Sequence, residues 1–203
     1  NISVLCEELA ISEVVLSVAD YFTNSSQSSP GHDCECVGQI INLCCTVLMI
    51  LCSNNPAQQL KCATIESSKI ISNILTWCLD PCNTSNGYHD NVAEMICRVV
   101  RNVSAHEEAQ AELIVNTSSN QDSISSCSIV TMVIELSELF LNQKEGCIHN
   151  SNHSKVSVSS VHTNYYVLEA IIFALINLSC DDSVVTLIAS AGGCFVPINI
   201  IHS

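Results

Sequence analysis

The sequence predicts an all-α protein, and three observations support this class. Apolar residues recur with the 3.6-residue period of a helix, and polar stretches rich in Ser, Asn, Gly and His separate the periodic segments. A strict alternation of apolar and polar residues is lacking, and no Asn-Gly pair joins two such runs, so no β-hairpin is indicated. Aliphatic residues and cysteine dominate the apolar content, since 48% of the 203 residues are hydrophobic and only 4% are aromatic.

The first 52 residues contain three predicted helices. Two short amphipathic runs cover residues 2–10 and 13–22, and a polar, low-complexity stretch over 23–36 follows them. Residues 37–52 are apolar on nearly every face, which is typical of a helix buried at the centre of a fold.

Turn and cap residues mark the next helices. Pro56 suits the first turn of a helix, with Asn54 or Asn55 as its cap. A second helix is expected to begin at Ser67 or Ser68 and to stop before Pro81. The remaining helices are predicted at 91–104, 107–115, 129–141, 165–179, 183–191 and 195–201.

The charge balance excludes several classes of partner. Six basic residues against 20 acidic ones give a net charge of −14. Binding to nucleic acid requires a basic stripe that neutralises phosphates, and docking on an anionic membrane surface requires basic residues too. The longest apolar runs also fall short of the ~20 residues of a membrane span. We therefore expect neither a nucleic acid nor a membrane as partner.

Three segments can be superimposed without gaps, at residues 48–55, 100–107 and 175–182. Each one ends a long apolar helix, makes a tight polar turn and enters a short helix, and a longer helix follows before the pattern returns. Because a repeating unit of this kind cannot bury its apolar faces alone, we expect neighbouring units to stack. The spacing between units is uneven, and the extra length lies in polar inserts at 82–90, 116–126 and 142–164. A further polar insert at 23–36 precedes the first of the three segments.

These residues resemble the armadillo repeat. Leu-Ile-Asn-Leu-Ser at 175–179 is similar to the end of that family's third helix, and Gly192-Gly193 followed by Val196-Pro197-Ile198 is similar to its junction between the first and second helices. Asn-Val-Ser at 102–104 repeats the first part, whereas the earliest unit has Ile50 in place of the asparagine. The resemblance implies an armadillo/HEAT-like α-solenoid, a right-handed superhelix of about four partial or complete repeats. We interpret residues 1–203 as one such domain and, because the chain begins at Asn1, as a fragment of a longer solenoid that continues beyond Ser203.

The same resemblance gives the candidate binding residues. In armadillo proteins that bind extended peptides, the asparagine of the third helix faces the concave groove and binds the peptide backbone, which implies such a role for Asn102 and Asn177. A carboxamide both donates and accepts hydrogen bonds, so the chemistry is suitable. The alternative is that each asparagine binds the backbone of a neighbouring repeat. One turn earlier, where family members often place Trp, this chain has Arg98 and Phe173.

The chain contains no recognisable catalytic or cofactor motif. It has no phosphate-binding loop, and no local signature pairs a Cys or Ser nucleophile with a histidine. Cys and His residues gather at 32–36 and 147–162, but neither stretch contains the paired spacing of a structural zinc site. We expect no enzyme activity, no cofactor and no metal, although a Cys/His-rich metal-binding or redox-sensing protein is the alternative from another class.

We therefore expect a non-enzymatic scaffold or adaptor that binds a protein partner or extended peptide in its groove. The acidic balance favours a basic or polar partner surface. A narrower hypothesis within the same fold is an adaptor in cilium or axoneme assembly, similar to the ciliary armadillo branch that carries radial-spoke components. The expected location is the cytoplasm, with the cilium or nuclear-cytoplasmic exchange as narrower options.

The 14 cysteines give a direct test of that location. Cys44, Cys45, Cys97 and Cys180 fall in apolar helical segments, where a thiol acts as a small apolar side chain, so we predict that most cysteines are free. Alkylation before and after reduction, read by mass spectrometry, measures this. Three or more native disulfides would instead indicate an extracellular protein.

Overall fold

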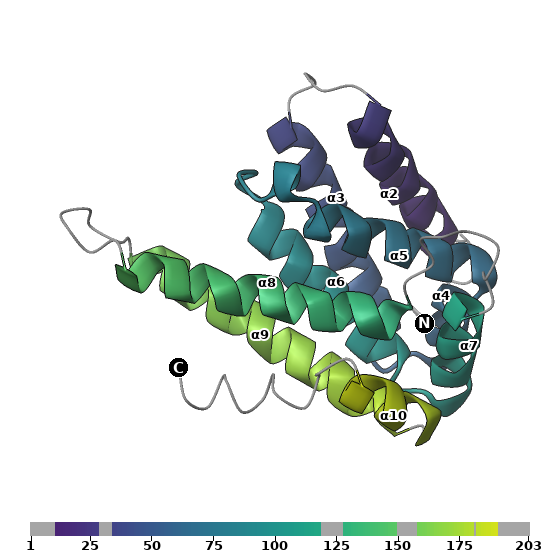
Figure 1. Cartoon of the computed structure of the whole chain (residues 1–203). Helices are drawn as coiled ribbons and strands as arrows, with labels where there is room; N and C mark the ends of the chain where they lie inside the picture. The colour runs from purple at the N-terminus through teal and green to yellow at the C-terminus, as the bar shows by residue number, and fades with distance from the viewer. Residues whose placement is uncertain (1–10, 29–33, 119–127, 150–157, 181, 191–203) are drawn as a thin grey trace.

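The computed structural model of the chain describes residues 11–28, 34–118, 128–149, 158–180 and 182–190 (Figure 1). Its regular elements within these ranges are all helical, so the prediction of an all-α fold is confirmed there. The helices are α2 (Ile11–Ser28), α3 (Cys34–Cys52), α4 (Pro56–Cys62), α5 (Ile65–Leu79), α6 (His89–Val103), α7 (Glu107–Ser118), α8 (Ile129–His149), α9 (Val158–Leu178) and α10 (Asp182–Ser190), and a 3₁₀ turn, η1 (Pro81–Asn83), follows α5.

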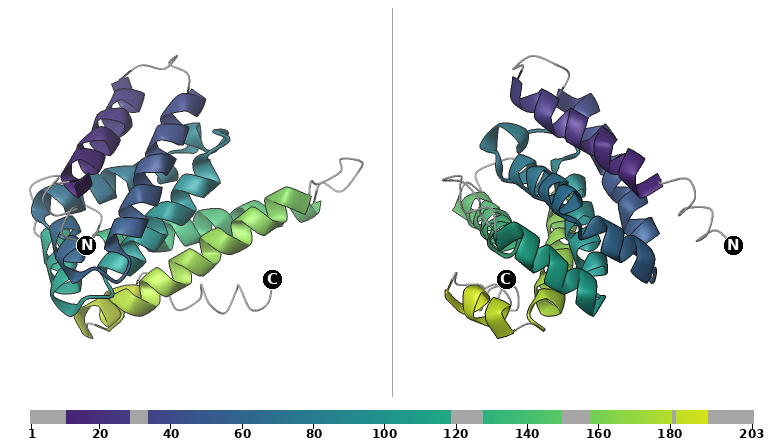
Figure 2. Two further views of the ribbon diagram at one scale, coloured as in Figure 1. Left: turned by 180° about the vertical axis from the view of Figure 1, so that it is seen from behind. Right: turned by 90° about the vertical axis from the view of Figure 1, so that its right-hand side faces the viewer.

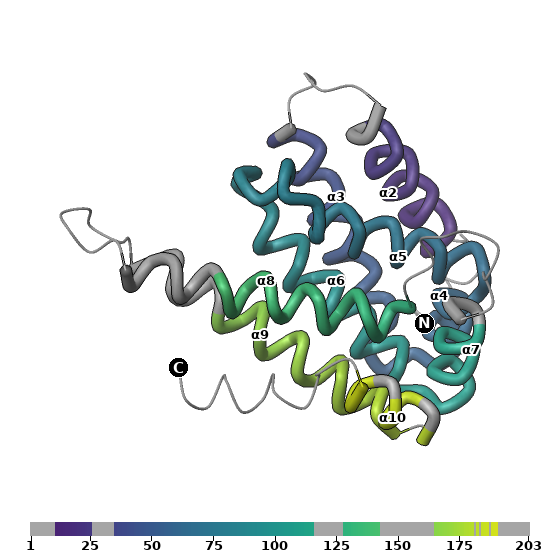
Figure 3. The backbone as a smooth tube through the Cα atoms, in the orientation of Figure 1, coloured from purple at the N-terminus to yellow at the C-terminus, as the bar shows by residue number. Residues whose placement is uncertain are grey.

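The long helices form two rows. In one row α6 packs between α3 and α9, and in the other α5 packs between α2 and α8 (Figures 1 and 2). The rows are joined because α2 packs on α3, α5 on α6, and α8 on α9. The backbone trace shows α8 and α9 as an antiparallel hairpin (Figure 3). The three apolar helices predicted at 37–52, 91–104 and 165–179 thus lie side by side in the first row.

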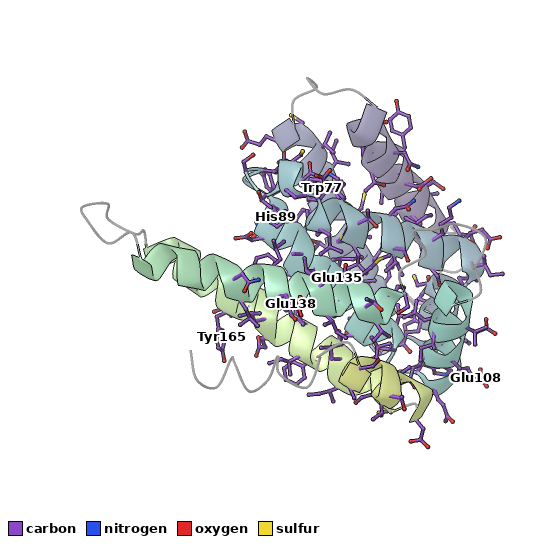
Figure 4. The ribbon with its side chains drawn as sticks, viewed as in Figure 1. Trp77, His89, Glu108, Glu135, Glu138 and Tyr165 are labelled. Carbon is purple, nitrogen blue, oxygen red and sulfur yellow. The ribbon has the colours of Figure 1, made fainter. Side chains whose placement is uncertain are left out.

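The core between the two rows consists mainly of Ile, Val, Leu, Ala and Cys side chains. Three buried rings adjoin one another in this core: Trp77 near the end of α5 lies beside His89 at the start of α6, and His89 stacks on Phe140 of α8 with ring centroids 5.8 Å apart (Figure 4). His89 is buried and its Nε2 lies 2.8 Å from the carbonyl oxygen of Cys78, so this polar ring has a hydrogen-bond partner. Trp77 is 2% exposed, which confirms that it is a core residue.

The caps of α4 agree with the sequence prediction, but the start of α5 does not. The side chain of Asn55 accepts a hydrogen bond from the backbone N–H of Gln58, and Pro56 occupies the first turn. Helix α5 begins before the predicted Ser67, because Thr64 is its N-cap and accepts from the N–H of Ser67. The predicted stop at Pro81 is correct, since α5 ends at Leu79.

Several helices extend into the predicted inserts. Helix α2 continues to Ser28, α3 starts at Cys34, α7 reaches Ser118, and α8 and α9 take up both ends of 142–164. In α2 the hydroxyls of Thr23 and Ser25 donate to the carbonyls of Ala19 and Tyr21, four residues earlier, so these polar residues are accommodated in the helix. The predicted helices at 2–10 and 195–201 lie outside the described residues.

Helix α3 is the most apolar element of the first row. Residues Glu35–Cys52 are long and apolar enough to cross a membrane, by length and composition only. The same composition suits a core helix, and α3 packs against α2 and α6. This apolar segment therefore packs against other helices of the same chain.

We predict that Phe140 contributes strongly to the stability of the core. Replacing it by alanine (Phe140→Ala) removes a ring that is fully buried and stacked on His89, and should lower the free energy of unfolding by about 3–5 kcal/mol. Chemical denaturation followed by circular dichroism measures this. Glu138→Ala on the exposed face of α8 is the control and should change stability by less than about 0.5 kcal/mol (Figure 4). Equal losses from the two changes would contradict the assignment.

Candidate functional site

The candidate binding residues lie on α6 and α9, the second and third helices of the first row. Both asparagines make the same kind of contact. The Nδ2 of Asn102 donates to the carbonyl oxygen of Met49 on α3 at 2.9 Å, and the Nδ2 of Asn177 donates to the carbonyl oxygen of Arg101 on α6 at 2.8 Å. Each asparagine therefore reaches back to the preceding helix of the row.

The two acceptors occupy equivalent places. When residues 48–55 are superimposed on 100–107, Met49 falls on Arg101, one position before the residue that matches the asparagine. Both carbonyls lie in the last turn of a helix, where carbonyl oxygens have no N–H donor four residues ahead within the helix. The asparagine of the following unit supplies a donor, and the contact is repeated from α3 to α6 and from α6 to α9.

This geometry bears on the two interpretations of the asparagines. Both amide groups donate to the backbone of a neighbouring helix, which is the arrangement that the alternative interpretation describes. Contact with a partner's backbone stays a prediction, and it would have to use the remaining hydrogen-bonding capacity of each side chain.

Two glutamines make related contacts that the sequence analysis missed. The Nε2 of Gln110 on α7 donates to the carbonyls of Asn177 and Leu178 at the end of α9, at 2.6 and 3.2 Å. The Nε2 of Gln59 on α4 donates to the carbonyl of Cys52 at the end of α3, at 2.8 Å. Both side chains are buried, and each lies on a short helix. A polar residue on an otherwise apolar helix face is the sequence signal that could have identified them.

Arg98 and Phe173 have different surroundings. Arg98 pairs with Glu94 on its own helix, with Nη2 and Oε1 2.7 Å apart. Phe173 is 40% exposed, and the guanidinium of Arg101 lies over its ring, 4.7 Å from the centroid. A cation held over an aromatic face in this way gains electrostatic attraction. Arg101 was not among the predicted site residues, yet it contacts α9 through both its side chain and its carbonyl.

The four predicted residues therefore fall into two groups. Phe173 and Asn177 are brought together with Arg101 at the contact between α6 and α9. Asn102 faces α3, and Arg98 is held by Glu94 on the surface of α6.

The search for metal ligands in the described part of the chain gives no cluster of three or more His, Cys, Asp or Glu side chains. The side chains at 147–162, and those of His32 and Cys34, lie outside it. Among the described residues, six buried cysteines are free thiols: Cys44, Cys45, Cys52, Cys62, Cys78 and Cys97.

Comparisons with known proteins do not extend this description. The chain matches no protein-family model, no curated protein and no solved structure. The similarity to the armadillo repeat therefore depends on the residues of this chain alone.

We predict that the two asparagines contribute to stability. Asn102→Ala should lower the free energy of unfolding by about 1–2 kcal/mol, because it leaves the carbonyl of Met49 without this donor. Asn102→Asp keeps the shape but places a carboxylate against the carbonyl, and should cost more. Thermal and chemical denaturation measure both effects.

Asn91→Ala, at an exposed position of the same helix, is the matched control and should have little effect. If Asn102→Ala and Asn91→Ala were equally stable, the contact with Met49 would not stabilise the stack.

Proposed function

We propose that this chain is an armadillo-type α-solenoid that acts as a non-enzymatic protein-binding scaffold. The observation that carries the proposal is the repeated contact from a third-helix asparagine to the end of the preceding third helix, Asn102 to Met49 and Asn177 to Arg101. Two equivalent contacts in one chain are expected when equivalent units stack with one geometry.

The helix order supports the division into units. Helices α4, α5 and α6 form one unit of a short helix and two longer ones, and α7, α8 and α9 form the next. Helices α2 and α3 supply the second and third helices of an earlier unit, and α10 the first helix of a later one. The proposal is thus two complete and two partial repeats in a right-handed superhelix.

The first edge of the stack supports the same division. Leu43, Val47 and Ile50 are exposed on α3 at helical spacing. In the repeat register, Val47 and Ile50 correspond to Val99 and Asn102 of α6, where Val99 is fully buried and Asn102 binds α3. We propose that a further helical unit covers this apolar stripe, and that the solenoid likewise continues beyond Ser203.

The proposed partner surface is the outer face of α6 and α9, which we take as the concave side. Arg101 is exposed there and offers N–H groups to carbonyl or carboxylate oxygens, while Phe173 and Ile176 offer exposed apolar area. Aromatic residues and arginine are the types that contribute most to protein interfaces. The partner that suits this surface is an extended, polar segment, and the net charge of −14 favours basic flanking regions.

The compartment belongs to the same proposal. A scaffold with many free, buried thiols suits the reducing cytoplasm, and no feature of the described residues favours the cilium over another site.

The experiment compares capture of partners from a source extract by the wild-type chain and by the double variant with Arg101→Ala and Phe173→Ala. One partner recovered by the wild type should bind the variant about tenfold more weakly, because two central interface side chains are lost. Quantitative mass spectrometry of the captured proteins, followed by titration of that partner, measures this.

Lys69→Ala at an exposed position of α5 is the control and should leave binding unchanged. Equal binding by wild type, double variant and control would contradict this partner surface. Loss of binding in both the double variant and the control would point to an effect on folding, which circular dichroism would detect.

A further inference from the structure

Two cysteines meet where α3 turns into α4. Cys52 is the last residue of α3 and Cys62 the last residue of α4, and their sulfur atoms lie 3.4 Å apart. Both side chains are fully buried. Ten positions separate them in sequence, so the pair is created by the turn and the short helix between them.

The corner that carries these thiols is tightly defined. Asn54 has a left-handed backbone with φ of 53°, a conformation that asparagine tolerates better than most residues. The amide of Gln59 donates to the carbonyl of Cys52, and the side chain of Asn55 caps α4. These contacts hold the two sulfur atoms near each other, which raises the effective concentration of one thiol at the other.

We propose that Cys52 and Cys62 are a site of reversible oxidation, at which a hydroperoxide converts the thiol pair into a disulfide that fastens α4 to the end of α3. This goes beyond the proposed scaffold function and does not depend on it, because it involves no partner protein.

The reaction balances with hydrogen peroxide as the oxidant. The thiolate of Cys62 attacks one peroxide oxygen, the O–O bond breaks, and water leaves after protonation, so Cys62 becomes a sulfenic acid. The sulfur of Cys52 then loses its proton and attacks the sulfur of Cys62, the S–O bond breaks, and a second water leaves. The two thiols together lose two electrons, which reduce hydrogen peroxide to two molecules of water.

The order of the two steps follows from the hydrogen bond between the thiols. Cys52 donates its S–H to the sulfur of Cys62, which lowers the pKa of Cys62, and the same hydrogen bond together with burial raises the pKa of Cys52. Since the thiolate is the nucleophile, Cys62 is the first to react and Cys52 the resolving thiol.

Two other core cysteines are buried as fully as Cys52 and Cys62, so their reactivity can be compared directly with that of the pair. Cys45 and Cys97 are also fully buried, and burial raises the pKa of Cys97 to about 12. Burial likewise raises the pKa of Cys45. Neither should therefore be converted as readily as Cys62.

The test exposes the folded, reduced chain to hydrogen peroxide and then alkylates it in denaturant. After reduction, a second alkylating reagent labels the thiols that had been oxidised. Chymotrypsin cleavage after Leu51 and Leu60 places Cys52 and Cys62 in separate peptides, so mass spectrometry reads each one. We expect both to carry the second label equally, with at least fivefold more than Cys45 or Cys97, and a cross-linked Cys52–Cys62 peptide before reduction.

Two further measurements keep the result decisive. In Cys52→Ser, Cys62 should stop at the sulfenic acid and react with dimedone, whereas Cys97→Ser should still form the disulfide. The oxidised wild type should melt at a higher temperature than the reduced protein, and dithiothreitol should reverse the shift. If Cys52→Ser does not fold, the labelling of Cys52 and Cys62 in the wild-type protein tests the proposal by itself. The proposal would be overturned if both cysteines carried the first label. It would also be overturned if all buried cysteines were oxidised at the same rate.

Discussion

The ends of α3, α6 and α9 impose the constraint on which the packing of the first row of helices depends. A helix leaves its last four carbonyl oxygens without internal donors, and a stacked neighbour that excludes water from them must supply replacements. This chain uses neutral carboxamides for the purpose. Asn102 and Asn177 reach back to the preceding helix of their row, and Gln110 binds the end of the following one. Because each asparagine lies on a different helix from its acceptor, these contacts also fix how far α6 is offset from α3 and α9 from α6.

Neutral polar groups have a comparable role within the core. Only 13% of the residues are charged, and the buried polar side chains are mostly amides, hydroxyls and one imidazole. His89 is bound to the carbonyl of Cys78 and stacked on Phe140, and Asn83 donates to the carbonyl of Trp77. These contacts tie the turn after α5 to the core through hydrogen bonds that satisfy its buried polar groups. Small aliphatic and cysteine side chains fill most of the remaining space.

The helix order and the first row of helices could be predicted from the sequence, because apolar periodicity is local information. The direction of the asparagine side chains could not. Asn102 binds a residue 53 positions away and Asn177 one 76 positions away, and a partner-binding asparagine would occupy the same place in the repeat. The sequence also missed Arg101, since its stacking on Phe173 depends on how α6 and α9 approach each other. Helix ends were misjudged where serine and threonine hydroxyls bind carbonyls of their own helix, as in α2.

Each asparagine contact restricts the residue type on only one of the two helices that it joins. The donor has to be a particular side chain, but the acceptor is a main-chain carbonyl that every residue type provides. The acceptor positions hold Met49 and Arg101, and the matching position on α9 holds Ile176. A thioether side chain at Met49 and a guanidinium at Arg101 are thus both compatible with the contact. Substitution at these positions can therefore change the side chains on the surface while the main-chain contact that sets the helix register is kept.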